Sequence, residues 1–344
     1  MKFKGFLLIF ATLLASLYLT AHSAATYITY AYPTVVFSGV TEPEPLTSTP
    51  PSESPEISTM GEAEVKTEKP DEQIPVAAVG TAKGKIIKEF LSPYNAGSSY
   101  NNVYVKNSTG ASLDIKGLLE AKCGFALQNT SEPQVLIVHT HTTESYLNEA
   151  KDYYTDADLS RTTDDEKNLI AVGKILKAGL EAQNIGVIHA TEKHDYPEYT
   201  GSYDRAAVTI KKYLEKYPTI SVVIDLHRDS MTDGSGNKTA LTTKINGQKA
   251  AQVMLVSGCQ NGGVTGFPKW RENFRLALRL QQTMETKYPG FARPIHFTSR
   301  KYNQHITTGS LLIECGTDAN TLDEAKYSAV LLADCIGATL KTLK

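Results

Sequence analysis

The sequence contains little cysteine and no excess of charge of either sign. Its four cysteines lie far apart in a chain of 344 residues, and no pair has the CxxC spacing of a structural zinc ribbon. Such sparse cysteines also argue against a disulfide scaffold. The formal net charge is −2. Bulk charge therefore does not select a partner, and a nucleic-acid-binding protein is not expected.

A long membrane-spanning run is also missing. The apolar segment from Phe6 to Leu19 is shorter than the ~20 residues that a spanning helix usually needs. Two lysines precede it and small residues follow it, which is typical of an export signal. We predict that residues 1–25 form a signal-like N-terminal anchor in the cell membrane, with the rest of the protein outside the cytoplasm. Secretion after signal cleavage is the alternative.

Residues 41–80 have almost no aromatic or large aliphatic side chains and are dominated by Pro, Glu, Ser and Thr. Such a segment cannot bury enough apolar surface to fold. We therefore predict that residues 26–80 are a disordered tether between the anchor and the folded part.

The folded part has two predicted regions. Residues 81–132 contain short strand-like pieces at 83–87, 102–106 and 113–119, and they predict a small β-rich appendage. From residue 133 to 344, apolar strands alternate with amphipathic helices. This alternation predicts an α/β fold, a doubly wound and mainly parallel sheet with helices on both faces. The predicted strands are 135–138, 185–189, 220–227, 250–256 and 311–314, and the predicted helices begin near 163, 203, 270 and 321.

Polar side chains stand where three of these strands end. His139 and His141 follow the first strand, His227 ends the third, and Glu314 ends the last. In open α/β sheets, ligands bind beyond the carboxyl ends of the strands. Histidine nitrogens and a carboxylate oxygen are the ligands of a catalytic Zn²⁺. The alternative is that each residue is an ordinary hydrogen-bonding group.

Five blocks of the chain, in this order, resemble the stage II sporulation protein P family. They are HTHTTESY at 139–146, RTTDDEKN at 161–168, VIDLHRD at 223–229, RKYNQH at 300–305 and LIECGTDAN at 312–320. That family comprises membrane-anchored cell-wall hydrolases related to zinc N-acetylmuramoyl-L-alanine amidases, which degrade peptidoglycan during engulfment of the forespore. The resemblance implies a peptidoglycan substrate and a Zn²⁺ cofactor. It also implies a lytic transglycosylase and a membrane sporulation protein as partners.

The resemblance further implies roles for single residues. His141, Glu166 and His227 are expected to hold the metal, with His139 as the rival of His141 and Glu144 as the rival of Glu166. Glu166 also stands at the fourth position of a possible capping box that begins at Thr163, so helix-end hydrogen bonds would explain it equally well.

Glu314 matches the catalytic carboxylate of the family, which exchanges a proton with the metal-bound water. Cys315 departs from the family pattern, where a small aliphatic residue is expected, but no base beside it indicates a cysteine nucleophile. The remaining candidates are expected to contact glycan or peptide or to polarise the scissile carbonyl: Arg228, Asn303, Gln304 and His305.

The implied reaction is hydrolysis of the amide between N-acetylmuramic acid and the first L-alanine of the stem peptide. An endopeptidase activity on peptide crosslinks is associated with the family as well. A zinc carboxypeptidase or another amidohydrolase is the alternative among enzymes. A non-catalytic cell-wall-binding scaffold is the alternative from another class.

Overall fold

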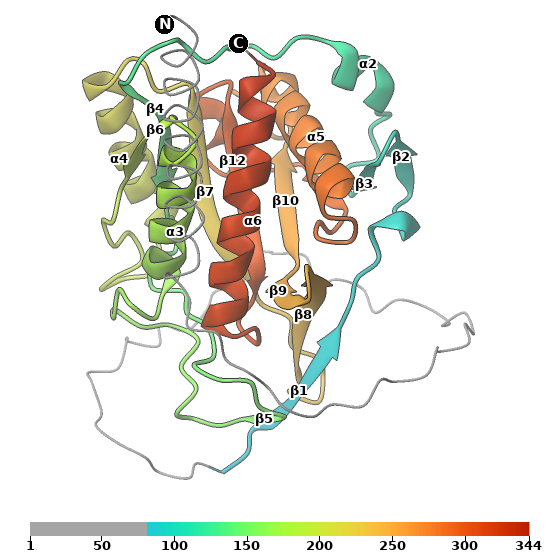
Figure 1. The fold of residues 1–344 in the computed structure, drawn as a ribbon, viewed down its shortest axis with the longest axis vertical. Helices are drawn as coiled ribbons and strands as arrows, with labels where there is room; N and C mark the ends of the chain where they lie inside the picture. Colours follow the sequence, from blue (N-terminus) through green and yellow to red (C-terminus); the bar gives the residue numbers. More distant parts are fainter. Residues whose placement is uncertain (1–80, 344) are drawn as a thin grey trace, which may run out of the picture. The chain divides into compact units, whose positions relative to one another are not determined.

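The structure is a computed structural model that describes residues 81–343 (Figure 1). The predicted anchor and tether, residues 1–25 and 26–80, lie outside the described residues and stay predictions. Between residues 81 and 343, no helix is both long and apolar enough to cross a membrane.

The described chain is built on one large mixed sheet. Its eight strands follow the order β2, β3, β11, β10, β12, β7, β4, β6. Neighbours run parallel except in the pairs β2–β3 and β10–β12. The bounds are β2 Ser98–Tyr100, β3 Val103–Asn107, β11 Ile295–Thr298, β10 Val253–Gly258, β12 Ser310–Thr317, β7 Val222–Asp229, β4 Pro133–Val138 and β6 Gly186–His189. The predicted α/β class is confirmed. The doubly wound arrangement is not, because β10 runs antiparallel to β12 in the middle of the sheet.

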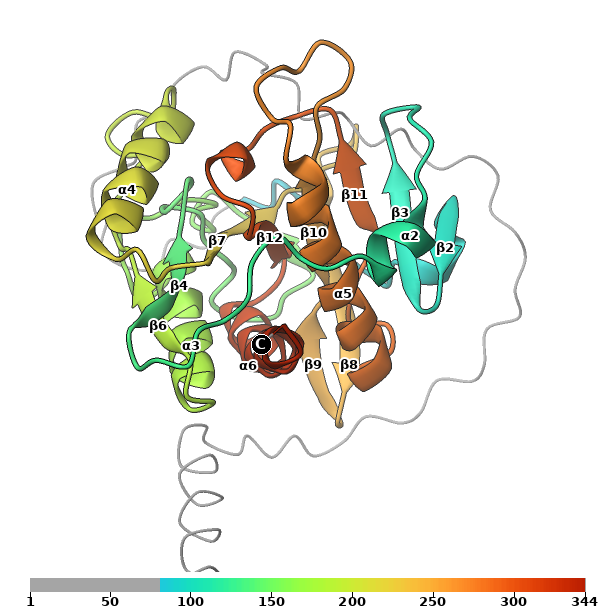
Figure 2. The same cartoon turned by 90° about the horizontal axis from the view of Figure 1, so that it is seen from above.

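Helices cover the two faces unequally (Figure 2). On one face lie α3 (Leu169–Glu181), α5 (Trp270–Lys287) and α6 (Leu322–Lys341), and on the other α4 (Ser202–Lys216) packs against β4. The main hydrophobic core lies under the first three helices. Side chains of a strand alternate between faces, so the core takes every second residue of β7 and β12. The other residues of these strands face the side that carries α4.

Residues 81–132 are joined to the rest of the fold, so the predicted appendage is not confirmed. The strands β2 and β3 form one edge of the large sheet. In a second sheet of order β5, β1, β8, β9, strand β1 pairs in parallel with β8. Its strands are β5 Tyr153–Tyr154, β1 Gly84–Glu89, β8 Lys238–Ile245 and β9 Gln248–Ala251. Short 3₁₀ turns at Pro93–Asn95 (η1) and Gln304–Ile306 (η2) complete the elements.

Three local predictions are wrong. The piece at 113–119 is helical in α2 (Ile115–Glu120), because the Asp114 carboxylate accepts a hydrogen bond from the Gly117 N–H and caps a helix. The helix expected near 163 begins at Leu169, where Asn168 is the N-cap, so no capping box joins Thr163 to Glu166. The predicted strand at 250–256 is divided between β9 and β10.

The strand β8 was not predicted. It pairs with β9 through a tight turn at Asn246 and Gly247, where both residues have positive φ. Positive φ at both positions is the geometry of a two-residue hairpin turn, and Asn-Gly is the sequence that best adopts it.

The capping box of α6 provides a test of the fold. Thr321 accepts a hydrogen bond from the Glu324 N–H, and the Glu324 carboxylate accepts one from the Thr321 N–H. Thr321→Ala should lower the free energy of unfolding by about 1 kcal/mol in chemical denaturation. Thr286→Ala, on the exposed side of α5, is the matched control and should cost nothing, because alanine is the better helix former. Equal losses in both variants would contradict the assigned cap.

Candidate functional site

The centre of the site is a pair of side chains on neighbouring strands. His227 of β7 and Glu314 of β12 are register partners in the parallel pairing of these strands. Leu226 and Ile313, the residues before them, belong to the hydrophobic core. His227 and Glu314 therefore point to the opposite face, and both are buried.

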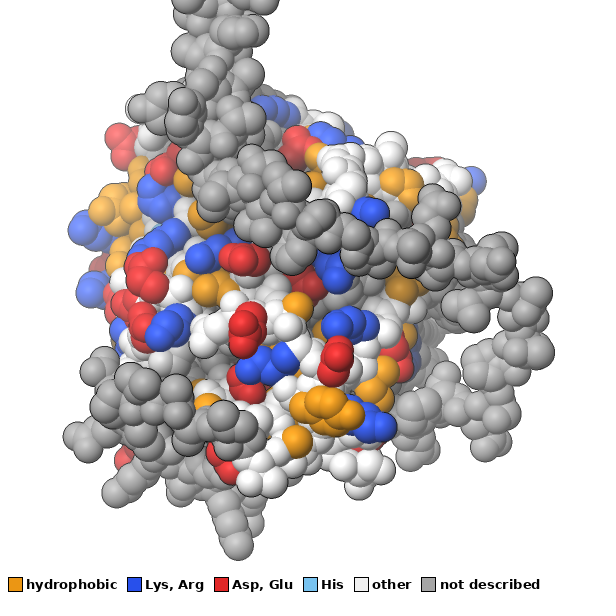
Figure 3. All heavy atoms as spheres, turned by 60° about the horizontal axis from the view of Figure 1, so that its bottom comes forward, with side chains coloured by type: hydrophobic (Ala, Val, Ile, Leu, Met, Phe, Trp, Pro, Cys, Tyr) orange, Lys and Arg blue, Asp and Glu red, His pale blue; other side chains and the backbone are white. Residues whose placement is uncertain are grey.

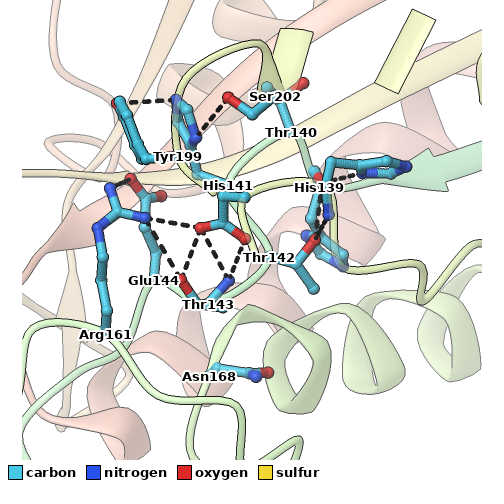
Figure 4. Close-up of polar contacts among 12 residues, drawn as sticks. His139, Thr140, His141, Thr142, Thr143, Glu144, Arg161, Asn168, Tyr199 and Ser202 are labelled. Atoms are coloured by element: carbon cyan, nitrogen blue, oxygen red, sulfur yellow. Dashed lines mark hydrogen bonds and ion pairs between the residues drawn. The ribbon is translucent and has the colours of Figure 1, made fainter. Parts of the chain in front are cut away.

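His141 lies beside this pair, at the start of the loop that follows β4. Its ring is edge-on to that of His227, with 5.2 Å between the centroids. The hydroxyls of Tyr199 and Ser202 lie 3.2 Å from its Nε2 and 3.3 Å from its Nδ1 (Figure 4). Tyr203 also contacts the ring, edge to face. Burial, together with the neighbouring His227, lowers the pKa of His141.

Glu144 is the carboxylate that the structure brings to the histidines. It is buried, and its Oε2 lies 3.7 Å from His227 Nδ1 and accepts a hydrogen bond from the Arg228 N–H. Glu166, the preferred candidate from sequence, is not brought there. Its side chain is 74% exposed and forms an ion pair with Lys174. The cause is the later start of α3, which leaves Glu166 in the surface loop before the helix.

His227 and Asp225 each shift the pKa of the other. Burial alone would lower the pKa of His227, but Asp225, 2.9 Å from its Nε2, raises it to about 10. Burial alone would likewise raise the pKa of Asp225, but His227 and hydrogen bonds from Thr140 lower it to about 2. The two residues form a buried ion pair that fixes the orientation of the His227 ring.

Glu314 has the opposite environment. Burial, opposed by His227 and reinforced by Asp229 and Glu144, raises the pKa of Glu314 to about 8. Its Oε2 is buried and has no hydrogen-bond partner among the described residues. A carboxyl group in this state is readily protonated near neutral pH.

His139 lies apart from the cluster (Figure 4). Its Nδ1 lies 2.9 Å from the Leu226 carbonyl oxygen and its Nε2 2.8 Å from Nε2 of His189. Burial and the neighbouring His189 lower the pKa of His139 to about 3. Both ring nitrogens are thus engaged on the side of α3, where Gly173 leaves room for the two rings.

The other candidates from the family blocks hold the fold together. Arg228 is buried, and its guanidinium donates to the backbone oxygens of Ser145 and Ser160. Asn303 donates to the Tyr203 carbonyl. Gln304 is buried, accepts from the Gly258 N–H and donates to the Val256 carbonyl.

His305 is exposed and lies edge-on to Phe267. In the described chain no contact joins it to His141 or His227. Cys315 points into the hydrophobic core, where burial raises the pKa of its thiol to about 12. It acts there as a small apolar side chain.

Four residues of the site were missed by sequence reasoning: Arg161, Tyr199, Tyr203 and Asp225. Asp225 had a usable signal, since it lies two residues before His227 on the same strand face. Arg161 stood in a family block but had no local chemical signal. The two tyrosines come from the turn before α4 and its first residues, whose approach to His141 no spacing predicts.

The described residues fit zinc in donor chemistry. Two imidazoles and a carboxylate converge from His141, His227 and Glu144, and Asp225 lies on the second nitrogen of His227. A carboxylate in that position is what orients metal-ligating histidines in many sites. Within residues 81–343, no three His, Cys, Asp or Glu side chains are already close enough together to hold a metal ion. The donors would therefore have to draw together on binding.

The surface of the described residues shows no dominant charge on the face in Figure 3. Lysine, arginine, aspartate and glutamate side chains are intermixed there.

The fold and site define a mixed α/β protein with a buried histidine and carboxylate cluster at the carboxyl ends of its strands. The chain belongs to the stage II sporulation protein P (SpoIIP) family, which matches residues 46–337. The predicted family is thus confirmed.

Stage II sporulation protein P of Bacillus subtilis (strain 168) is 32% identical over 219 residues, which cover 60% of this chain and 51% of that protein. The chain therefore spans about half the length of this curated relative. Among solved structures, the N-acetylmuramoyl-L-alanine amidase AmiC2 of Nostoc punctiforme matches with 10% identity and a TM-score of 0.35, over 61% of this chain and 96% of that one. An N-acetylmuramoyl-L-alanine amidase from Clostridium difficile 630 matches with 16% identity and a TM-score of 0.33, over 62% and 97%. Likeness at this level carries no conclusion about chemistry.

The role of Gln304 can be tested directly. Gln304→Ala leaves a buried N–H at Gly258 and a carbonyl at Val256 without their partner, so the free energy of unfolding should fall by about 1–3 kcal/mol. Gln128→Ala, at an exposed position, should leave it unchanged. Chemical denaturation measures both. A Gln304→Ala protein of normal stability that fails to bind or cleave peptidoglycan would instead make Gln304 a substrate contact.

Proposed function

We propose that the chain is a zinc-dependent peptidoglycan hydrolase that cleaves the amide between N-acetylmuramic acid and the first L-alanine of the stem peptide. The observation that supports this is the convergence of His141, Glu144, His227 and Glu314 in a chain of the SpoIIP family. Peptide crosslinks are a second proposed substrate, because their hydrolysis also breaks an amide. The proposed setting is septal wall degradation and engulfment during sporulation.

His141, His227 and Glu144 are the proposed metal ligands. Glu144 replaces Glu166 in this set because it alone of the two lies beside His227. Zinc, when bound, would lower the pKa of a water molecule and polarise the scissile carbonyl. Asp225 keeps the His227 ring oriented through Nε2, so that Nδ1 faces Glu144.

Glu314 is the proposed general base and acid. It is the register partner of His227, and its Oε2 has no hydrogen-bond partner in the described chain. A carboxyl group with a pKa raised toward neutrality can both accept a proton from water and return it to the leaving amine. Both transfers take place at that one oxygen.

The placement of the protein is also a proposal. An N-terminal anchor formed by residues 1–25 and a tether over 26–80 would hold the folded part at the outer side of the membrane, against the wall. A lytic transglycosylase and a membrane sporulation protein are proposed partners through the family alone.

The bond cleaved identifies the enzyme. Mass spectrometry of fragments released from purified peptidoglycan should find free lactyl groups on muramic acid together with peptides that begin with L-alanine. Peptides shortened at their carboxyl end would instead indicate a zinc carboxypeptidase, and other new amide ends another amidohydrolase. Binding to the wall without any released fragment would indicate a scaffold.

The ligand set predicts zinc content. His141→Ala, His227→Ala and Glu144→Gln should each remove most of the bound zinc, because losing one of three protein ligands leaves the ion weakly held. His139→Ala should retain more zinc, and the exposed Glu166→Gln should retain all of it. Elemental analysis of the purified variants measures this. Loss of zinc from Glu166→Gln, with retention in Glu144→Gln, would make Glu166 the carboxylate ligand, as the family resemblance implies.

Glu314→Gln tests the proton transfer. The variant should keep its fold and zinc while peptidoglycan turnover falls by roughly 10²–10⁴-fold. Glu285→Gln is the matched control, since Glu285 is also buried but accepts hydrogen bonds from the Gly290 and Ala292 N–H groups. It should lose stability and keep turnover. Normal turnover in Glu314→Gln would eliminate the catalytic role, and joint loss of zinc and turnover would make Glu314 a ligand.

A further inference from the structure

Arg161 connects three parts of the site. Its Nη1 donates to Asp195 Oδ2 over 2.7 Å, and its Nη2 lies 3.5 Å from Glu144 Oε1. The backbones of Arg161 and Glu144 form an isolated antiparallel bridge, which holds the two residues side by side. The side chain is 33% exposed, so it lies on the solvent side of the buried Glu144.

The ion pair between Arg161 and Glu144 determines the orientation of the Glu144 carboxylate. Its Oε1 faces the guanidinium groups of Arg161 and Arg228, at 3.5 and 3.9 Å. Its Oε2 faces His227 Nδ1 and the Arg228 N–H. Since the two arginines engage Oε1, Oε2 is the oxygen left toward His227, the position that a shared metal would require.

A stack of side chains links the same arginine to His141 (Figure 4). The Arg161 guanidinium carbon lies 4.6 Å from the centroid of the Tyr199 ring. That ring in turn is stacked on His141, with 4.6 Å between the centroids and 12° between the planes. A cation over an aromatic face is attracted by the ring, so Arg161 presses Tyr199 against the imidazole.

We propose that Arg161 is a positioning residue that holds Glu144 by its ion pair and His141 through Tyr199. The inference rests on the proposed function, because it concerns the ligand set named there. Asp195 does not need Arg161 for its hydrogen bonds, since it also accepts from the Thr143 N–H and hydroxyl. Arg161 therefore positions the proposed ligands Glu144 and His141 in addition to pairing with Asp195.

The chemistry of the guanidinium explains why lysine is a poor substitute here. A planar guanidinium can donate to Asp195, face Glu144 and stack on Tyr199 at the same time. An ammonium group is a point charge without a flat face, so it preserves the charge but not the stack and the two directed contacts. Arg161→Lys thus separates positioning from charge compensation.

Zinc affinity of the full chain is the measurement. The metal-free protein is titrated with zinc against a chelator of known affinity, and its thermal unfolding is recorded. Arg161→Lys should weaken zinc binding by about 10–100-fold, the usual effect of removing a group that orients a ligand. Tyr199→Leu, which removes the stack and the hydroxyl beside His141 Nε2 but leaves the ion pair, should weaken it by a smaller factor.

Arg279→Lys is the matched control. Arg279 donates to the carbonyl oxygens of Leu119 and Ala121, and neither hydrogen bond involves Glu144, Tyr199 or the His141 ring. It should lower the melting temperature of the metal-free chain and keep zinc affinity near that of the unsubstituted protein.

Two results would overturn the inference alone. One is unchanged zinc affinity in both Arg161→Lys and Tyr199→Leu, and the other is an equal loss of affinity in Arg279→Lys. An unsubstituted chain that binds no zinc would overturn the proposed metal function and this inference together, so the two failures are distinguishable. Should Arg161→Lys not fold, the Tyr199→Leu titration decides.

Discussion

The parallel pairing of β7 with β12 is the constraint on which the site depends. It makes His227 and Glu314 register partners on one face, while Leu226 and Ile313 enter the core on the other. Because side chains alternate with a period of two, a slip by one residue would bury the charged groups among the helices and expose the core residues. The hydrophobic core therefore specifies the register, and the register assembles the site.

The buried charges of the site are compensated with one exception. Asp225 faces His227, and both Asp195 and Glu144 face Arg161. Charges removed from water are costly unless they are paired and hydrogen-bonded, so these contacts are conditions for folding as well as for any chemistry. Glu314 is the exception, with a buried oxygen that has no hydrogen-bond partner in the described chain and a pKa raised to about 8. A buried carboxylate oxygen without a hydrogen-bond partner calls for a functional explanation.

The sequence predicts best where structure follows from local pattern. The strands that become β4, β6, β7 and β12, and the helix α5, are found from apolar runs and periodicity within three residues of their bounds. The same patterns predict that His141, His227 and Glu314 approach one another, because the ends of neighbouring parallel strands meet at one edge. They could not show that β10 is antiparallel, since nothing in an isolated strand records its direction.

The differences from expectation share another cause. Glu166 was preferred over Glu144 because the Glu-Lys-Asn block at 166–168 matches the family glutamate that opens a helix, whereas in the structure the Asn168 side chain caps α3 and Glu166 lies before the helix. A match in local sequence does not show which carboxylate the fold brings to His227, and the packing of the loops places Glu144 there. In the same way, the approach of Arg161 and Tyr199 to His141 depends on how two loops pack, and no periodicity describes it.

The loops around the site are ordered by one another, and Arg228 explains how. Its backbone N–H donates to Glu144, while its guanidinium donates to the carbonyl oxygens of Ser145 and Ser160. The Ser145 N–H also donates to the Ser160 carbonyl, so one residue of β7 ties the loop after β4 to the loop that carries Arg161. A rigid strand thus sets the positions of two segments that have no regular structure of their own. This accounts for a buried arginine directly after His227. Through its hydrogen bonds, Arg228 fixes the position of Glu144, which is proposed to hold the metal, relative to the sheet.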